Sequence, residues 1–351
     1  MSAPSSDFQL IFLQKIQRLF TEGDFVATYK FALMMALSDI AVLQGEDTDA
    51  ELSLRLHDVA EAFARYYWPQ TVPYVSGPQS SEADLLVQNN GKQAAVVRLL
   101  GRLRDKGVRT LDVARHDPEW RPILTKLTDT LLRMPVTYLQ NVGGEADLFL
   151  YDPPAGIRDP LVLKPGITFC LRRFHGFIHE LAKAGWVNHV RANKRNQRII
   201  GPVHDLEAFM FGTPRQALGL IAGVLRPLQH GSCFYCGGRL STGAEVDHFV
   251  PWSRYPQDTA HNFVLAHRGC NNDKRDLLAG SRHLDHWMQR NADFGEQIEH
   301  QIGVLGFIAD TSASLEVARW AYHQGVDMGA HGWLAIKETE RLGQDCLALL
   351  R

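Results

Sequence analysis

The stretch Cys233-Phe-Tyr-Cys236 and, further along the chain, His267-Arg-Gly-Cys270 place four metal-binding side chains in two pairs with the same spacing. Two residues separate the ligands of each pair, as in a zinc knuckle. Three thiolates and one imidazole are a closed tetrahedral set of the kind that binds structural zinc. A single Cys-x-x-Cys would also suit a redox motif, whereas two such pairs around one short segment favour a metal-bound module. The sequence therefore predicts one structural Zn²⁺, held by Cys233, Cys236, His267 and Cys270.

The segment between the two pairs, and the residues just after it, carry a base, hard oxygen ligands and a lysine. They read Glu245-Val-Asp247-His248-Phe-Val-Pro251, then His261-Asn262, and finally Asn271-Asn272-Asp273-Lys274. The neutral imidazole of His248 can accept a proton near pH 7. Asp247 offers a carboxylate suited to Mg²⁺ or Mn²⁺, and Asn271 offers an amide oxygen. Hydrolysis of a phosphodiester requires such groups, namely a base for water and a cation on the phosphate.

The order of these residues resembles the HNH, or ββα-metal, endonuclease family. The resemblance covers about residues 230–280, and the flanking regions carry no family that we recognise from their residues. It implies hydrolysis of nucleic-acid phosphodiesters by a ββα module that a structural zinc stabilises. It implies that His248 activates water and that Asp247 and Asn271 hold one catalytic cation, Mg²⁺ or Mn²⁺. It further implies that Asn262 holds the loop between strand and helix and orients the histidine.

Local patterns place the site residues on a strand and a helix. The run 244–250 is rich in β-formers and predicts a strand. Neighbouring side chains of a regular strand face opposite ways, so Asp247 and His248 can share one site only at a bend or at the strand end. A helix is predicted over 266–278. We expect Lys274, on that helix, to reach a phosphate beside the catalytic cation.

Three assignments stay open at this point. Many members of the family have cysteine where this chain has His267, so His261 is a substitute for the fourth zinc ligand. Asn262 is either the family's loop-holding residue or an ordinary Asx-turn residue. Glu245 is either an acid that supports Asp247 or a solvated surface residue, and the second interpretation is the more common one for a glutamate.

A basic cluster is the second feature with a functional meaning. Between residues 172 and 198 there are seven cations and one anion, with aromatic and amide side chains between them. Phosphate contacts need cations, and reading of bases needs amides and aromatic faces. The residues that we expect to bind nucleic acid are Arg172, Arg173, Arg191, Lys194, Arg195 and Arg198. The alternative is a solvated basic face without a ligand.

Bulk properties limit the class of protein. The formal net charge is −2 and the mean hydropathy is −0.18, so the overall charge does not point to nucleic acid. Cys170 and Cys346 lie outside the predicted zinc set, and free thiols of this kind fit a reducing compartment. The N-terminus lacks the basic and apolar regions of a signal peptide, and no apolar run is as long as a membrane span. We therefore expect a cytoplasmic protein without a membrane partner.

Composition along the 351 residues predicts a mainly α fold with a small α+β part, in four segments. The segments are a helical domain (1–140), a basic α+β segment that binds nucleic acid (141–212), the HNH nuclease domain (213–280) and a helical C-terminal region (281–351). An almost wholly apolar helix over 24–43 should be buried. The basic segment should contain two or three short strands and a helix over 168–184, in a winged-helix-like or another small α+β arrangement. Further helices are expected over 281–291, 294–307, 312–325 and 331–350.

The function predicted from these features is that of a metal-dependent HNH endonuclease that hydrolyses DNA. A nuclease domain inside a larger helical body suits a restriction or antiviral-defence effector with protein partners, and a mobile-element nuclease is another setting. Alternatives are an RNA-targeting HNH nuclease, which would use the same site, and a catalytically inactive, zinc-stabilised nucleic-acid-binding protein. The Asp247-His248 pair and Asn271 argue against the inactive protein, because a structural knuckle does not need them. The sequence leaves the oligomeric state undetermined, with a dimer among the options.

Overall fold

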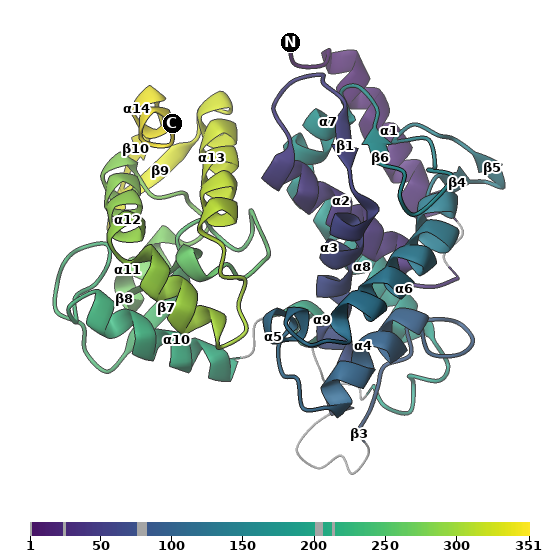
Figure 1. Ribbon diagram of the computed structural model, residues 1–351. Helices are drawn as coiled ribbons and strands as arrows, with labels where there is room; N and C mark the ends of the chain where they lie inside the picture. Colours follow the sequence, from purple (N-terminus) through teal and green to yellow (C-terminus); the bar gives the residue numbers. More distant parts are fainter. Residues whose placement is uncertain (1, 24–25, 76–82, 201–205, 213–214) are drawn as a thin grey trace. The chain divides into compact units, whose positions relative to one another are not determined.

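The chain folds into two compact units. The computed structural model describes residues 2–23, 26–75, 83–200, 206–212 and 215–351, and the units comprise residues 1–212 and 213–351 (Figure 1). Helices make up 55% and strands 12% of the residues that the structure describes, which confirms the predicted mainly α fold with a small α+β part. The finer division into four segments, with further boundaries at 140/141 and 280/281, stays a prediction.

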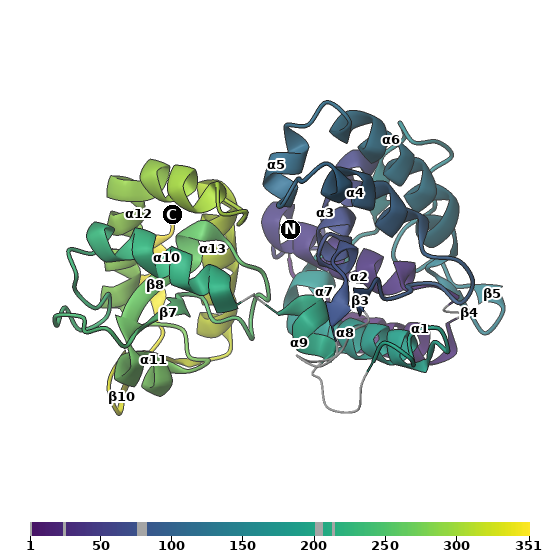
Figure 2. The same ribbon diagram turned by 90° about the horizontal axis from the view of Figure 1, so that it is seen from below.

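The N-terminal unit is built around one buried helix. α2 (Tyr29–Gln44) is apolar on nearly all sides and is buried from its first residue to Val42. A helix without a polar face must be covered all round, and α3 (Leu56–Tyr67), α7 (Ile167–Arg173) and α8 (His175–Ala192) pack against it (Figure 2). The buried apolar helix predicted over 24–43 is therefore present, although residues 24 and 25 lie outside the described part of the chain.

Further helices complete this unit. They are α1 (Ser6–Glu22), α4 (Ala95–Asp105), α5 (Leu111–Arg115), α6 (Trp120–Leu131) and α9 (Leu206–Phe211), with a π-helical turn over Leu132–Val136 and a 3₁₀ turn over Pro69–Thr71. The hydroxyl of Ser5 caps α1 by accepting a hydrogen bond from the Phe8 N–H (3.3 Å). α6 packs against both α3 and α4. Among the described residues, no helix of either unit combines the length and the apolar character that crossing a membrane requires.

Short strands pair within the loops of this unit. β1 (Leu52–Leu54) pairs antiparallel with β6 (Leu161–Leu163), β2 (Tyr74–Val75) with β3 (Ala83–Asp84), and β4 (Asn141–Val142) with β5 (Glu145–Ala146). The short strands expected after residue 140 are thus present as β4, β5 and β6. The single helix expected over 168–184 is instead the pair α7 and α8, which meet at Phe174. The basic segment therefore contributes two helices to the packing around α2.

The C-terminal unit has a ββα arrangement at its centre. β7 (Ala244–His248) pairs antiparallel with β8 (Phe263–His267) over five residue pairs, and α11 (Arg268–Lys274) follows β8 directly. α10 (Arg215–Leu228) packs against both strands, and α12 (Ser281–Gly303) packs against α10. The strand predicted over 244–250 and the helix predicted over 266–278 are both present, each shorter than expected.

The chain beyond the ββα core differs from the prediction. α12 is one continuous helix where the sequence predicts two, and α13 (Thr311–Asp327) covers the helix predicted over 312–325. The prediction of a helix over 331–350 is wrong. A hairpin of β9 (His331–Ala335) and β10 (Glu338–Arg341) occupies most of this range and precedes the short helix α14 (Gln344–Leu349).

Contacts of the hairpin with the ββα core explain this difference. The Trp333 ring packs against Tyr235 and His283, with ring centroids 5.1 and 5.3 Å away. Its indole N–H donates to Asp273 Oδ2 (2.8 Å), and the same oxygen accepts the N–H of Lys337 (2.8 Å), which has a positive φ of 63°. These partners lie far away along the chain, so tertiary contacts override a local pattern that favours helix.

Candidate functional site

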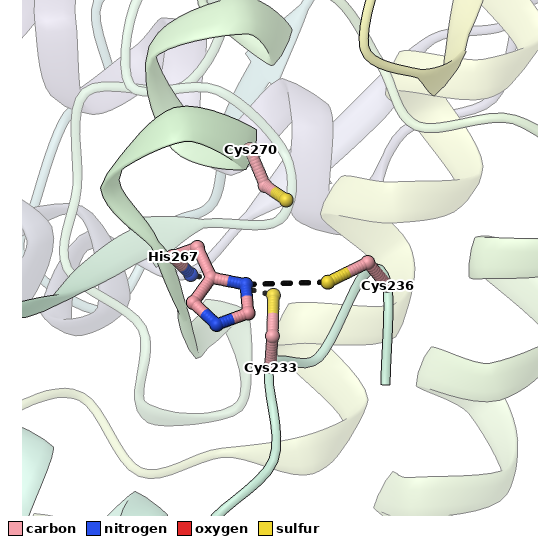
Figure 3. A group of neighbouring side chains, drawn as sticks. All are labelled: Cys233, Cys236, His267 and Cys270. Carbon is pink, nitrogen blue, oxygen red and sulfur yellow. Dashed lines mark hydrogen bonds between the residues drawn. The ribbon is translucent and has the colours of Figure 1, made fainter. Parts of the chain in front are cut away.

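A loop, a strand end and a helix bring the predicted zinc ligands together (Figure 3). Cys233 and Cys236 lie before β7, His267 is the last residue of β8, and Cys270 lies in α11. One ligand atom of each residue lies within 4.8 Å of the ligand atoms of the other three. Three sulfurs and one imidazole nitrogen this close suit tetrahedral zinc, with Zn–S bonds of about 2.3 Å. The group can therefore hold the predicted structural zinc.

Hydrogen bonds set the orientation of the His267 ring. Its Nε2–H donates to the carbonyl oxygen of Arg239 (3.0 Å), which leaves the lone pair of Nδ1 facing Cys236 Sγ at 3.2 Å. Metal-binding imidazoles usually have such a partner on the second nitrogen. The alternative ligand His261 is buried elsewhere, with its Nε2 3.0 Å from the carbonyl oxygen of Gly295. His267 is therefore the imidazole of this group.

The surroundings of the thiols also favour a bound cation. Burial, together with the neighbouring charges of Cys233 and Cys236, raises the pKa of Cys270 to about 12. Burial likewise opposes ionisation of Cys236, yet the Gly238 N–H and the His267 ring lower its pKa below the usual value. Thiolates this close repel one another unless a cation lies between them. The donor set thus fits zinc chemically as well as geometrically.

A cavity of about 570 Å³ lies where β7 ends. Its lining residues come from the strand end, the loop that follows and the region of α11: Asp247, His248, Pro251, Trp252, Asn271, Asn272, Arg275 and Asp276. His248 is the last residue of β7, so the strict alternation of a strand no longer applies beyond it. Asp247, His248 and Asn271, which the sequence assigns to one site, therefore line one cavity.

Asp247 is held from behind by two buried groups. The Tyr235 hydroxyl donates to Asp247 Oδ2 (2.5 Å), and Lys274 Nζ lies 3.1 Å from the same oxygen. Oδ1 has no hydrogen-bond partner among the described residues and stays available to a ligand. Lys274 is 0% exposed and also donates to the carbonyl oxygen of His248 (3.0 Å). The expectation that Lys274 reaches a phosphate is thus wrong, because the helix turns this side chain inward, where it positions Asp247 and the strand end.

A carboxylate outside the sequence motif, Asp258, fixes the His248 ring. His248 Nε2 lies 2.8 Å from Asp258 Oδ1, and the imidazole packs against the rings of Trp252 and Phe263. An Nε2–H that donates to Asp258 leaves Nδ1 as the proton-accepting nitrogen. Asp258 lies in an irregular loop without a motif, so no sequence pattern indicates this pairing.

Asn262 fastens the loop that follows His248. Its side-chain oxygen accepts the N–H of Val250 (2.7 Å), and its amide nitrogen donates to the carbonyl oxygen of Val250 (2.9 Å). Its own backbone carbonyl accepts the N–H of Phe249 (2.7 Å). Three hydrogen bonds across buried residues make this more than a local Asx turn. The Asn262 side chain is buried. It therefore holds the loop in place and does not contact a substrate.

Asn271 is oriented by an acidic neighbour. Its Nδ2 donates to Glu245 Oε2 (3.0 Å), which leaves the amide oxygen for another partner. Arg268 lies 3.5 Å from the second oxygen of the same glutamate. Glu245 thus links β7 to α11 through Asn271, while its side chain remains 37% exposed to solvent. Its support goes to Asn271 and not to Asp247.

Arg275 supplies the exposed cation at the cavity. It follows α11 directly, lines the cavity and is exposed to solvent. Its φ of 49° lies in the left-handed region, which residues with a side chain rarely adopt, and such strained positions cluster at functional sites. The residue pattern predicts the phosphate contact at Lys274, one position earlier. The direction of a side chain at a helix end depends on the cap geometry, which the residue pattern does not indicate.

The residues predicted to bind nucleic acid differ in their exposure to solvent. Arg172 is buried, and its guanidinium donates to Asp47 Oδ1 (2.7 Å) and to the carbonyl oxygens of Ala41 (3.1 Å) and Val42 (2.8 Å) near the C-terminus of α2. Its assignment as a phosphate contact is therefore wrong, because the charge satisfies helix-end carbonyls within the unit. Arg173 is partly exposed.

The outer residues of the basic cluster lie together on the surface. Arg191, Lys194, Arg195 and Arg198 are exposed. The last three line a groove of about 570 Å³ that also includes Asp84, whose carboxylate lies 3.3 Å from the Arg198 guanidinium. Asn196 lies beneath them, where its amide bonds the backbone N–H (2.7 Å) and carbonyl oxygen (3.0 Å) of Val87. The basic cluster thus presents cations to solvent. Asn196 instead bonds the backbone of Val87 and is not available to recognise a base.

Comparison with known protein families gives two matches. A domain of unknown function (DUF8808) matches residues 11–207, more than half of the chain. An HNH endonuclease family matches residues 233–279, which confirms the resemblance noted over about residues 230–280. No curated protein and no solved structure matches the chain.

Proposed function

Since the chain belongs to the family defined by a domain of unknown function (DUF8808) and carries an HNH endonuclease domain, we propose that it is a metal-dependent endonuclease that hydrolyses DNA. One observation carries this proposal. Asp247, His248 and Asn271 line a single cavity, with an exposed arginine on its wall. A zinc-stabilised module that only bound nucleic acid would need none of these groups in a shared cavity.

Asp247 and Asn271 are the residues that would hold a catalytic cation. Asp247 Oδ1 and the amide oxygen of Asn271 are hard donors, and these suit Mg²⁺ or Mn²⁺. When bound, such a cation supplies positive charge to the phosphate oxygens and the leaving oxygen. Lys274 and Tyr235 hold Asp247 by its other oxygen, and Glu245 holds the amide nitrogen of Asn271. The two donors are thus preorganised by partners that occupy only their remaining atoms.

His248 is the general base of the proposed reaction. Its Nδ1 accepts a proton from the attacking water, whose oxygen forms the new bond to phosphorus while the bond to the sugar oxygen breaks. A proton from solvent returns to that sugar oxygen. Asp258 keeps the ring in the tautomer that accepts at Nδ1 and stabilises the imidazolium that forms. Arg275 contacts the phosphate from the cavity wall, a place suited to charge that develops during the reaction.

The biological setting belongs to the same proposal. We infer a cytoplasmic effector of restriction or antiviral defence, in which the N-terminal unit binds the target or a protein partner and the C-terminal unit cuts. The exposed cations Arg191, Lys194, Arg195 and Arg198 support a nucleic-acid contact by the N-terminal unit. A mobile-element nuclease and a dimeric assembly stay compatible with these observations.

The test compares His248→Ala with His300→Ala, an exposed histidine of α12 in the same unit. Loss of a general base should lower cleavage of DNA in Mg²⁺ by about 10²- to 10⁴-fold, while zinc content and DNA affinity stay as in the wild type. Asp258→Asn should give a smaller loss, because the base remains but its orientation weakens. The His300→Ala variant should cut normally.

Three outcomes would redirect the proposal. Substantial cleavage by His248→Ala would remove His248 from the mechanism. Wild-type protein that binds DNA without cutting it, in Mg²⁺ or in Mn²⁺, would favour the inactive binding protein. Cleavage of RNA and not of DNA, with the same dependence on His248, would keep the site and change the substrate.

A further inference from the structure

A second group of metal-ligand side chains lies inside the N-terminal unit. Asp39 of α2 faces His175 and His179 of α8, and the three side chains are 4%, 0% and 1% exposed. Their ligand atoms all lie within 4.8 Å of one another. The two histidines are four residues apart on one helix, so their rings share a face and stack with centroids 4.1 Å apart. Two helices that are remote in sequence thus deliver two imidazoles and a carboxylate to one point.

The distances within the group are close to those of a coordination shell. Asp39 Oδ1 lies 2.9 Å from His175 Nε2 and 3.0 Å from His179 Nε2. Ligands of a tetrahedral ion with bonds of about 2.0 Å are separated by about 3.3 Å, so a shift of a few tenths of an ångström would admit one. The Tyr66 hydroxyl donates to Asp39 Oδ2 and leaves Oδ1 to the histidines. Ligating carboxylates are themselves commonly hydrogen-bonded in this way.

His179 shows that hydrogen bonds alone do not satisfy the group. Both of its ring nitrogens are buried and have no hydrogen-bond partner among the described residues. Its Nε2 is near Asp39 Oδ1 but is not aligned for a hydrogen bond with that oxygen. An unsatisfied polar group in the interior costs about 1–3 kcal/mol, and such groups call for an explanation such as an ion. A cation between the three ligand atoms would supply the missing partner of Nε2.

The chemistry of the three side chains also suits a metal ion. Buried carboxylates are hydrogen-bonded or paired with a cation, and Asp39 has the Tyr66 hydroxyl and the His175 ring within hydrogen-bond distance. A carboxylate and two neutral imidazoles form a ligand set for a divalent transition metal.

We propose that Asp39, His175 and His179 bind a divalent transition-metal ion, with zinc as the best fit to the ligands, and that this ion ties α2 to α8. Imidazole nitrogens suit zinc better than Mg²⁺ or Ca²⁺, which prefer oxygen. The group is closed off from solvent, so its role is to hold helices together and not to catalyse. α8 runs on to Arg191 and the exposed cations that follow, so the ion also fixes the base of the basic cluster.

The first test measures zinc in the purified full-length chain by elemental analysis. The wild type should contain two zinc ions per chain, one at the Cys₃His group and one here. His179→Gln should contain one, while the control His189→Gln, a partly buried histidine of the same helix outside the group, should keep two. Cys270→Ser should also contain one, because it removes only the other site. Equal zinc content in His179→Gln and the wild type would overturn the proposal.

A second test needs no variant and covers the case in which His179→Gln fails to fold. Wild-type apoprotein is titrated with Co²⁺, whose thiolate complexes absorb intensely, whereas sites with nitrogen and oxygen ligands absorb weakly. Two equivalents should bind tightly, and only one should produce thiolate-to-cobalt absorption. Binding of a single equivalent, all of it with the thiolate signal, would show that the N-terminal group is a metal-free polar network.

Discussion

Acidic and histidine side chains meet in both units of the chain, but at different depths. In the C-terminal unit, Asp247 and His248 are 11% and 17% exposed and line a cavity. In the N-terminal unit, Asp39, His175 and His179 lie in the core without access to solvent. A group that transfers protons must meet water and substrate, whereas a structural ligand set is strengthened when water is excluded. Depth, more than residue type, therefore separates the proposed reaction centre from the proposed structural site.

The basic side chains of the two units also differ in whether they are buried or exposed. Arg172 and Lys274 have the chemistry of phosphate-binding residues, but both are buried, and each holds a carboxylate of its own unit. Arg275 and Arg195 have the same charge and are exposed beside a cavity or groove. The comparison predicts that replacing a buried cation changes stability, while replacing an exposed one changes binding.

The largest effect is expected from removal of a zinc ligand in the C-terminal unit. Cys270→Ala should lose one zinc ion and unfold residues 213–351, because zinc binding contributes about 10–16 kcal/mol to the folding of such modules, more than the typical stability of a domain. Calorimetry should then show one transition, from the N-terminal unit. Cys346→Ala, which removes a buried thiol of the same unit, should keep both transitions and all the zinc. If Cys270→Ala also keeps both, the zinc is not a folding element.

A smaller effect is expected from the buried cation beside Asp247. Lys274→Met leaves that carboxylate without its cationic partner, with only the Tyr235 hydroxyl on the same oxygen. It should lower the free energy of unfolding of the C-terminal unit by about 3–5 kcal/mol, measured by urea denaturation. Lys337→Met, at an exposed lysine of the hairpin, should change it by less than about 0.5 kcal/mol.

The double variant Asp247→Asn/Lys274→Met separates the two roles assigned to this lysine. It should recover part of the stability, because the unpaired buried charge is gone. Unchanged stability of Lys274→Met, combined with weaker DNA binding, would restore the phosphate contact predicted from the sequence.

The smallest effect is expected at the exposed cluster. Replacing Arg191, Lys194, Arg195 and Arg198 by Gln should weaken DNA binding and reduce the slope of log affinity against log salt by up to about 3.6, since each lost phosphate contact accounts for about 0.9. Stability of the N-terminal unit should hardly change. A matched variant replaces four exposed cations elsewhere in the unit, namely Arg18, Arg55, Lys106 and Arg133. Equal salt slopes in the two variants would show that the cluster is only a solvated face.

Covalent spacing explains which features of the fold and the site could be predicted from the residue order alone. The two ligand pairs, the Asp247-His248 step and Asn271 lie within a short stretch, where a strand pair and a helix leave few ways to arrange them. The family resemblance, the zinc group and the choice of residues at the cavity could therefore be predicted. The buried helix near the N-terminus was predictable for the same reason, because an all-apolar helix has no face to offer water.

Packing of the folded chain sets which of the polar side chains face inward. Arg172 and Lys274 have the residue type of a phosphate contact, and only the packing of their helices turned them toward Asp47 and Asp247. The hairpin near the C-terminus and the Asp258 partner of His248 depend on surfaces that meet only after folding. His175 and His179 have metal-ligand spacing on their own, but their carboxylate lies 136 residues before the first of them. No local pattern contains such a partner, because burial and long-range pairing are properties of packed faces and not of neighbouring residues along the chain.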